Sequence, residues 1–318
     1  MSIISSDITK AKELLEAGEV VAIPTETVYG LAANIFNESA VKKIFDIKQR
    51  PLFNPLIVHI HDLTQLQKVA IEIPEKAKKL ADKFWPGPLT LVLKKRDTVP
   101  DLITAGKDTV AVRIPNHSVS LNLLKHLDFP LAAPSANPFN AISPTSAEHV
   151  AHYFSDQLKM VLQGGTCTRG LESSIVAFDG DEVILLRLGS ISAEEIESEV
   201  GKLSIMNKAT NKPTAPGMLS KHYSPATPFI KVENIQSFIN DHPKKKIGII
   251  SFNEGFKINA HSTQIILSPS GDLREAASKL YSSMHQLDLL DLDLIITESF
   301  PDRDLGRSIN DRISRATK

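Results

Sequence analysis

Cysteine is nearly absent from the 318-residue chain, which contains only Cys167. A single thiol excludes an internal disulfide framework and any zinc cluster built from cysteines, and it is typical of a reducing compartment. The N-terminal segment MSIISSDITKAKELLEAGEV also lacks the basic and apolar regions of a secretion signal. The longest uncharged stretch, residues 129–147, contains four prolines, which argues against a membrane span. We therefore expect a cytoplasmic protein without membrane contacts.

An excess of positive charge is absent as well. Lys and Arg total 36 and Asp and Glu total 37, so the net charge is -1. The chain therefore lacks the overall basic field that drives non-specific nucleic-acid binding, and any tRNA contact should be weak and local. The motifs GxxxxGK[ST], GxGxxG, HExxH, GxSxG and CxxC are missing too. If the protein binds ATP, it does so without the common phosphate-binding loops.

Residues 1–202 alternate between apolar runs of strand length and segments of helical period, which predicts an α/β domain with a substantial sheet. The predicted strands are residues 20–23, 56–60, 89–93, 110–114, 131–133, 175–178 and 183–188. The predicted helices are residues 8–17, 39–47, 74–84 and 118–126, one opened by the capping box Thr145-x-x-Glu148, and one after Ser192-x-x-Glu195.

The pattern lapses in residues 203–228, which are rich in Pro, Ser, Thr, Asn and Lys and are typical of a linker. A second α/β pattern follows in residues 229–318. Its predicted strands are 229–232, 247–252, 265–267 and 294–297, and its predicted helices are 234–240, 272–289 and 305–316. A chain of this length suffices for a smaller, Rossmann-like domain.

Polar side chains gather beside the predicted strands of the first domain, where α/β proteins usually bind ligands. The segments PTETVYG (24–30) and PSANP (134–138) follow strands, and GLESS (170–174) precedes one. Each segment alone is better explained as a turn whose hydroxyl groups cap its own backbone, and it is their common placement at strand ends that favours a site. His59 and His61 would face the same side of a strand, but no third ligand stands at a motif spacing, so we predict no metal site.

Four cations could contact an anionic ligand. Arg113 and Arg187 lie inside apolar strands, where a guanidinium group must be paired or face an anion. Either an internal carboxylate or a ligand carrying a carboxylate and phosphates would satisfy them. Lys48 and Arg50 follow a predicted helix and precede Pro51, so they could bind phosphate or simply complement the helix dipole.

These segments resemble the YrdC-like threonylcarbamoyl-AMP synthases in their long two-domain form. The resemblance runs in family order through PTETVYGL, KQRPLFNPLIVHI, FWPGPLTLVL, TVAVRIP, AAPSAN, SPTSAEHV, GLESSIV and PGMLSKHYSP, from Pro24 to Pro225. It implies a twisted α/β catalytic domain with a concave cleft (1–202), a linker that folds over the active site (203–228), and a small Rossmann-like accessory domain (229–318).

The resemblance implies a nucleotidyltransferase that converts L-threonine, bicarbonate and ATP to threonylcarbamoyl-AMP and pyrophosphate. This is the first step of N6-threonylcarbamoyladenosine formation in tRNA next to the anticodon. Mg²⁺ would be carried with ATP, with no tightly bound cofactor, and a separate tRNA threonylcarbamoyl-transferase complex would use the product. Two alternatives stay open: carbamoyl transfer of the hydrogenase-maturation type, and a double-stranded-RNA-binding module without catalysis.

The resemblance also assigns site residues. The L-threonine site would comprise Thr27, His59, Arg113, Ala133 through its backbone, and Ser173. The ATP site would comprise Lys48, Arg50, Asn54, Thr109, Ser135, Asn137, Ser143, Arg187 and, from the linker, Tyr223. Lys48, Arg50 and Arg113 are the expected catalytic residues.

The chain departs from the family pattern at Pro138-Phe139-Asn140, where a glycine-containing turn is common, at Ser174, and at Leu219-Ser220. We expect residues 213–225 to lie across the cleft, because a passive tether has no reason to place Tyr223 between a histidine and Ser-Pro. The alternative is a plain connection between two domains.

Overall fold

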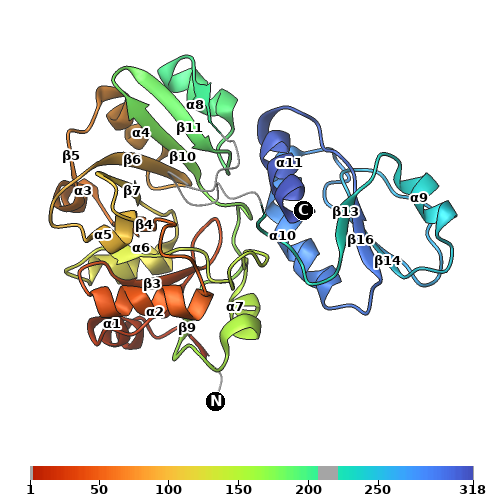
Figure 1. The fold of residues 1–318 in the computed structure, drawn as a ribbon, viewed down its shortest axis with the longest axis horizontal. Helices are drawn as coiled ribbons and strands as arrows, with labels where there is room; N and C mark the ends of the chain where they lie inside the picture. The colour runs from red at the N-terminus through yellow and green to blue at the C-terminus, as the bar shows by residue number, and fades with distance from the viewer. Residues whose placement is uncertain (1–2, 207–220, 318) are drawn as a thin grey trace.

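The computed structural model describes residues 3–206 and 221–317 (Figure 1). It contains a large mixed sheet and a smaller parallel sheet, each with its own helices. The predicted α/β fold is therefore confirmed. Among the described residues, no helix is both long enough and apolar enough to cross a bilayer.

The large sheet contains twelve strands. In spatial order they are β1 (Ile4–Ser5), β9 (Val161–Leu162), β2 (Val21–Ile23), β3 (Gly30–Asn34), β8 (Leu131–Ala132), β4 (Ile57–His59), β7 (Thr109–Arg113), β6 (Leu89–Lys95), β10 (Ser174–Asp179), β11 (Glu182–Arg187) and β12 (Ser204–Ile205), with β5 (Ala70–Ile71) pairing beside β6. Strand β12 lies within the residues predicted as linker. The sequence analysis did not predict β3, which follows the first polar segment directly.

Eight helices accompany this sheet in residues 3–206: α1 (Ile8–Glu16), α2 (Glu38–Lys48), α3 (Leu63–Val69), α4 (Glu75–Phe84), α5 (Asp101–Thr104), α6 (Ser118–Lys125), α7 (Ala147–Phe154) and α8 (Ala193–Val200). Helix α8 begins with the predicted capping box, because Ser192 Oγ accepts from the backbone of Glu195 and the Glu195 side chain accepts in return. The capping box predicted from Thr145 is wrong: Ser146 caps α7. The Thr145 carbonyl instead accepts a hydrogen bond from Cys167 N, which keeps Thr145 outside the helix.

The sheet buries apolar side chains on both faces. Along β2, Val21 and Ile23 share a buried cluster with residues of α1 and α6, whereas Ala22 packs in the cluster that contains α2. This alternation follows from the two-residue period of a strand. Polar side chains are consequently confined to the strand ends, where the candidate site lies.

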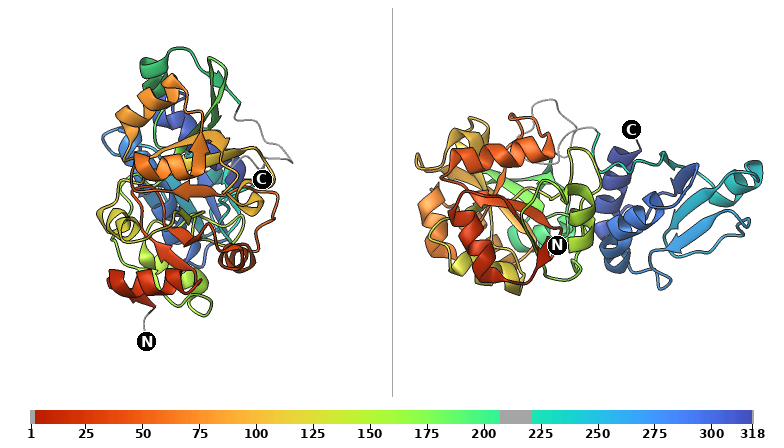
Figure 2. Two further views of the ribbon diagram at one scale, coloured as in Figure 1. Left: turned by 90° about the vertical axis from the view of Figure 1, so that its left-hand side faces the viewer. Right: turned by 90° about the horizontal axis from the view of Figure 1, so that it is seen from below.

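The second domain has four parallel strands in the order β13 (Phe229–Lys231), β16 (Leu294–Thr297), β14 (Ile247–Ser251) and β15 (Thr263–Ile266). Its helices are α9 (Ile235–Asp241), α10 (Leu273–Asp288) and α11 (Asp304–Ala316). Figures 1 and 2 show α10 and α11 between the small sheet and the first domain. These two helices therefore supply the second domain's side of the interface.

Candidate active site

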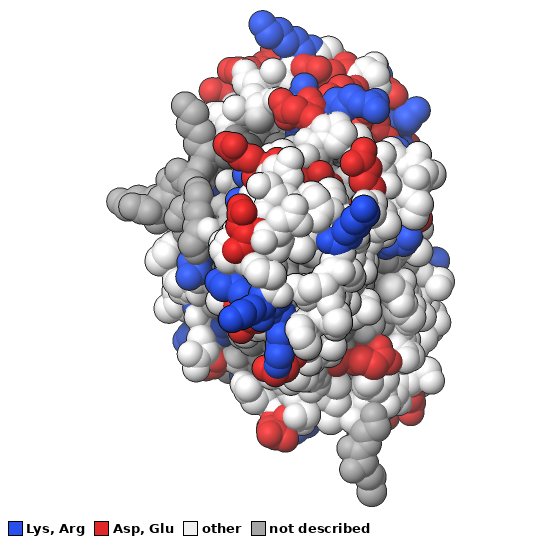
Figure 3. Space-filling view, turned by 90° about the vertical axis from the view of Figure 1, so that its right-hand side faces the viewer, with Lys and Arg blue, Asp and Glu red and all other residues white. Residues whose placement is uncertain are grey.

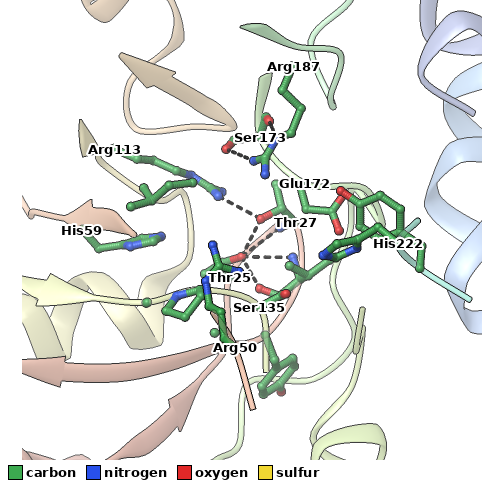
Figure 4. A pocket seen from close by; sticks show the side chains of 17 residues that line it. Thr25, Thr27, Arg50, His59, Arg113, Ser135, Glu172, Ser173, Arg187 and His222 are labelled. Atoms are coloured by element: carbon green, nitrogen blue, oxygen red, sulfur yellow. Dashed lines mark hydrogen bonds between the residues drawn. The ribbon is translucent and has the colours of Figure 1, made fainter. Parts of the chain in front are cut away.

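One cavity collects the polar segments that the sequence places at separate strand ends (Figure 4). It encloses about 570 Å³ of atom-free space, including the part open to solvent. Its lining comes from the turn between β2 and β3, the strands β4, β7 and β11, the segments after β8 and before β10, and the end of the linker. The lining residues are Thr25, Thr27, Val28, Tyr29, Gly30, Arg50, Ile57, His59, Arg113, Ala133, Pro134, Ser135, Glu172, Ser173, Arg187, His222 and Tyr223.

The threonines of the first segment have different roles. Thr25 Oγ1 accepts from the backbone N–H groups of Thr27 and Val28 and donates to the Val28 carbonyl, so it caps its own turn. Thr27 Oγ1 accepts from Arg113 Nη1 at 2.9 Å and lies 2.8 Å from Thr25 Oγ1. Thr25 already donates to a carbonyl and accepts two backbone N–H groups, so its hydroxyl is fully used within the turn. Thr27 Oγ1 keeps an acceptor lone pair beside Arg113 for the cavity.

Arg113 is the last residue of β7, and only 3% of its surface is exposed. Its Nη2 lies 2.7 Å from Glu26 Oε1, and its Nε donates to the Gly87 carbonyl at 3.2 Å. An internal carboxylate partner therefore exists, although Arg113 also lines the cavity. Thr27 accepts one N–H of Nη1, whereas Nη2 lies at ion-pair distance from Glu26 without a hydrogen bond to any described residue, so both nitrogens keep N–H groups for a ligand.

His59 lies on the neighbouring strand β4 and pairs in register with Arg113 of β7. Burial, and then the charge of Arg113, lower the pKa of His59 to about 3. The imidazole is consequently neutral at physiological pH, and Arg113 provides the positive charge on this side of the cavity.

Arg187 and Glu172 form the opposite wall. Arg187 donates through Nε to the Ser173 carbonyl and through Nη2 to Ser173 Oγ, both at 3.0 Å. Glu172 Oε1 accepts from Ser143 Oγ at 2.7 Å. Burial raises the pKa of Glu172, but the charges of Arg312 and Arg187 outweigh it and lower the value to about 2. Glu172 is therefore ionised and lies close to Arg187 and Arg312.

Arg50 reaches the cavity because helix α2 ends at Gln49 in a left-handed conformation, with φ of 52°. Its Nη2 donates to the Pro55 carbonyl at 3.0 Å. Burial and the charge of Arg187 lower the pKa of Arg50 to about 9. Lys48 lies behind the cavity, where its Nζ donates to the carbonyls of Ser135 and Asn137, and burial lowers its pKa.

The five residues predicted for L-threonine all line this cavity: Thr27, His59, Arg113, Ala133 and Ser173. Of those predicted for ATP, Arg50, Ser135, Arg187 and Tyr223 line it, whereas Lys48, Asn54, Asn137 and Ser143 are buried behind it. Thr109 stands at the opposite end of β7 from Arg113 and lies outside the cavity.

The end of the linker contributes His222 and Tyr223, which are both buried. Ser224 N donates to the Asn140 carbonyl at 2.8 Å, which anchors this segment on the first domain. The rest of the predicted lid, residues 213–220, lies outside the described residues, as does the departure at Leu219-Ser220. The turn at Pro138-Phe139-Asn140 is formed without glycine, because Asn140 itself adopts a φ of 68°.

The sequence analysis gave no role to His222, Glu172, Tyr281 or Arg312. Arg312 could have been found from helical periodicity, because it stands among the apolar positions of α11 with Ile309 and Ile313. The contact between the two domains that buries Arg312 could not have been found from the sequence.

Comparison with known proteins finds matches along nearly the whole chain. A family model described as telomere recombination matches residues 13–189, and one described as the C-terminal domain of threonylcarbamoyl-AMP synthase matches residues 191–317. A threonylcarbamoyl-AMP synthase of Bacillus subtilis is 40% identical, over 97% of this chain and 92% of that protein. One of Schizosaccharomyces pombe is 34% identical, over 93% of this chain and 84% of that protein. The crystal structure of Pyrococcus abyssi Sua5 complexed with L-threonine aligns with a TM-score of 0.92 and 40% identity, covering 98% of this chain and 94% of that one.

Proposed function

The chain belongs to the Sua5/YciO/YrdC family, in its two-domain threonylcarbamoyl-AMP synthase form, and we propose that the cavity is where this reaction occurs. L-threonine, bicarbonate and ATP are converted to threonylcarbamoyl-AMP and pyrophosphate. The observation that carries the assignment is the convergence of three guanidinium groups, from Arg50, Arg113 and Arg187, on one largely buried cavity. A substrate pair with a carboxylate at one end and phosphates at the other matches this distribution of charge.

The threonine half of the site is the wall around Arg113. The N–H groups of Arg113 Nη1 and Nη2 that face the cavity would bind the threonine carboxylate. The threonine ammonium group must lose a proton before its amine can attack the carbon of bicarbonate; a C–O bond of the adduct then breaks and water leaves, which gives the carbamate. The lone pair of Thr27 would accept an N–H from that amine, and neutral His59 adds no second cation beside it.

The nucleotide half is the wall that contains Arg50, Ser135, Arg187 and Tyr223. A carbamate oxygen would attack the α-phosphorus of ATP, and the bond from that phosphorus to pyrophosphate would break. Such a transfer needs alignment and charge neutralisation rather than a protein nucleophile. Arg50 and Arg187 supply the positive charge, and Lys48 fixes the segment of Ser135 by donating to its carbonyl.

Magnesium would enter with the triphosphate, held by phosphate oxygens and water. Among the described residues that line the cavity, Glu172 is the only carboxylate, and both of its oxygens already accept hydrogen bonds from protein groups. The cavity-lining residues therefore suit a metal ion that enters bound to ATP better than a metal ion that is coordinated by protein side chains.

The product would pass to a separate tRNA threonylcarbamoyl-transferase complex in the cytoplasm. The net charge of -1 supports this division of labour, because the chain has no overall basic field for RNA. Figure 3 shows acidic and basic side chains mixed on the face where the second domain lies. The single cysteine also disfavours the hydrogenase-maturation alternative, which uses CxxC zinc repeats.

Pyrophosphate release by the purified protein tests the function, with threonine, bicarbonate and ATP omitted in turn. We expect release only with all three, and without RNA. Release that does not depend on threonine, or binding of double-stranded RNA without pyrophosphate release, would contradict the proposal.

A further inference from the structure

The only carboxylate among the described cavity-lining residues is held by the second domain. Glu172 Oε2 accepts from Arg312 Nε at 2.9 Å and from Tyr281 Oη at 3.1 Å. Arg312 belongs to α11 and Tyr281 to α10. The other oxygen, Oε1, accepts from Ser143 Oγ. All four side chains are buried, so the orientation of Glu172 depends on both domains.

Arg312 also contacts two further parts of the nucleotide half. Its guanidinium carbon lies 5.0 Å from the centre of the Tyr223 ring, within the range of a cation–π contact. Its Nη2 donates at 2.7 Å to the carbonyl of Leu188, the residue that follows Arg187. Asp311 Oδ2 lies 2.6 Å from its Nη1, and the same carboxylate also pairs with Arg315. A single side chain of the second domain therefore fixes three elements of one cavity wall.

We propose that Arg312 and Tyr281 are positioning residues for ATP, which act through Glu172 and Tyr223 on the wall that carries Arg187. The inference rests on the proposed function, because it takes this wall as the nucleotide half. Neither residue reaches the cavity itself. The second domain thus completes the nucleotide half, whereas the threonine half is built by residues of the first domain.

Simple docking of the two domains does not explain this cluster. The same domains are joined at the periphery by Arg274 with Glu195 and by Arg307 with Glu194, whose side chains remain 38–55% exposed. Exposed pairs of this kind contribute little stability. A buried ion pair costs much desolvation, and apolar side chains would hold an interface at least as well. What apolar side chains could not do is orient a carboxylate that accepts from Ser143.

The test compares Arg312→Met, Arg312→Lys and Tyr281→Phe with Arg307→Met as a matched control. Arg307 lies on the same helix and also forms an ion pair with the first domain, but it contacts no cavity-lining residue. Steady-state pyrophosphate release would give the KM for ATP and for threonine separately. Calorimetric titration with ATP would give nucleotide affinity without turnover, and thermal unfolding would report stability.

We expect Arg312→Met to raise the KM and the Kd for ATP by about 10-fold or more, since a hydrogen bond to a charged group is lost. Tyr281→Phe should raise them by about 3-fold or more, since it removes one of the two donors to the charged Glu172 Oε2. The KM for threonine should stay within about 2-fold, as should every constant of Arg307→Met. Arg312→Lys should recover only part of the loss, because an ammonium group cannot contact Glu172 and Leu188 as the planar fork does.

If Arg312→Met and Arg307→Met change the KM for ATP equally, or if Arg312→Met weakens the binding of ATP and threonine equally, the inference is wrong. Arg312 would then only hold the two domains together. If Arg312→Met fails to fold, Tyr281→Phe decides, because it removes one oxygen and keeps the packing of the ring. A wild-type protein that releases no pyrophosphate would contradict the proposed function. The ratio of ATP affinities between wild type and Tyr281→Phe would still test the inference.

Discussion

Replacing Arg113 by alanine should impair threonine binding and protein stability for two separable reasons. The guanidinium group is the cation of the threonine half, and it is also the partner of buried Glu26. Charge-assisted hydrogen bonds contribute about 1.5–3 kcal/mol, so threonine affinity should fall by about 10- to 150-fold. Loss of one partner of a buried ion pair costs about 3–5 kcal/mol, because the Glu26 carboxylate would remain buried without a counterion.

The double variant Arg113→Met with Glu26→Gln separates the two effects. It removes both charges while it keeps similar side-chain volumes, so stability should recover relative to Arg113→Ala. Threonine binding should remain weak, because the carboxylate of the substrate still has no cation. Arg113→Lys should rescue binding poorly, since an ammonium group cannot contact Thr27, Glu26 and a ligand in one plane.

Calorimetric titration with threonine and urea unfolding of the same preparations are the measurements. Wild-type threonine affinity in a folded Arg113→Ala protein would refute the assignment of the threonine half. A double variant as unstable as Arg113→Ala would refute the role of Glu26, because the cost could then not come from an unpaired carboxylate.

Three further predictions concern other parts of the site. Lys48→Met should raise the KM for ATP by about 10-fold or more in pyrophosphate assays, because two backbone carbonyls lose a charged donor. Tyr223→Ala should lower ATP affinity and product yield. In the wild-type protein, ATP with threonine should protect the linker from protease. If affinity, yield and cleavage are all unchanged, the linker only connects the two domains. Acidification should destabilise the fold, because the pKa values of His59, His222 and His285 are lowered from 6.5 to about 3 by burial. Above pH 6.5 each of these histidines is neutral in both the folded and the unfolded protein. Below pH 6.5 only the unfolded protein binds the proton, so each histidine should lower the free energy of unfolding by up to about 1.4 kcal/mol per pH unit down to about pH 3. Urea unfolding at pH 7 and pH 5 would measure this loss.

Local signals were sufficient for most elements and failed where tertiary contacts decide the structure. The capping box at Ser192 formed as predicted, because both partners lie within one helical turn. Strand β3 was missed because its sequence, GLAAN, contains no β-branched residue and does not alternate. The shift of the α7 cap from Thr145 to Ser146 depends on a hydrogen bond from Cys167, which no local pattern reports.

Nine of the fourteen residues that the resemblance assigns to the site line the cavity, but the contacts among them could not be predicted. Arg113 and Arg187 could be identified as exceptional because each interrupts an apolar strand. The sequence left open whether a carboxylate or a ligand faces Arg113, and the structure shows that a carboxylate and the cavity share it. The role of Arg312 depends on how the second domain docks, which is a property of the folded surface rather than of any motif.

Two buried carboxylates flank the cavity, and the source of their partners differs. Glu26 is paired with Arg113 of its own domain, so the cation of the threonine half is oriented before any substrate arrives. Glu172 is held by Arg312 and Tyr281 from the second domain, and Tyr223 of the linker lies beneath the same guanidinium group. On our proposal, the wall for threonine is completed by the first domain alone, whereas the wall for the nucleotide also needs the docked second domain. Under the proposed assignment, ATP affinity therefore depends on the docking of the second domain through Glu172 and Tyr223, whereas threonine affinity does not.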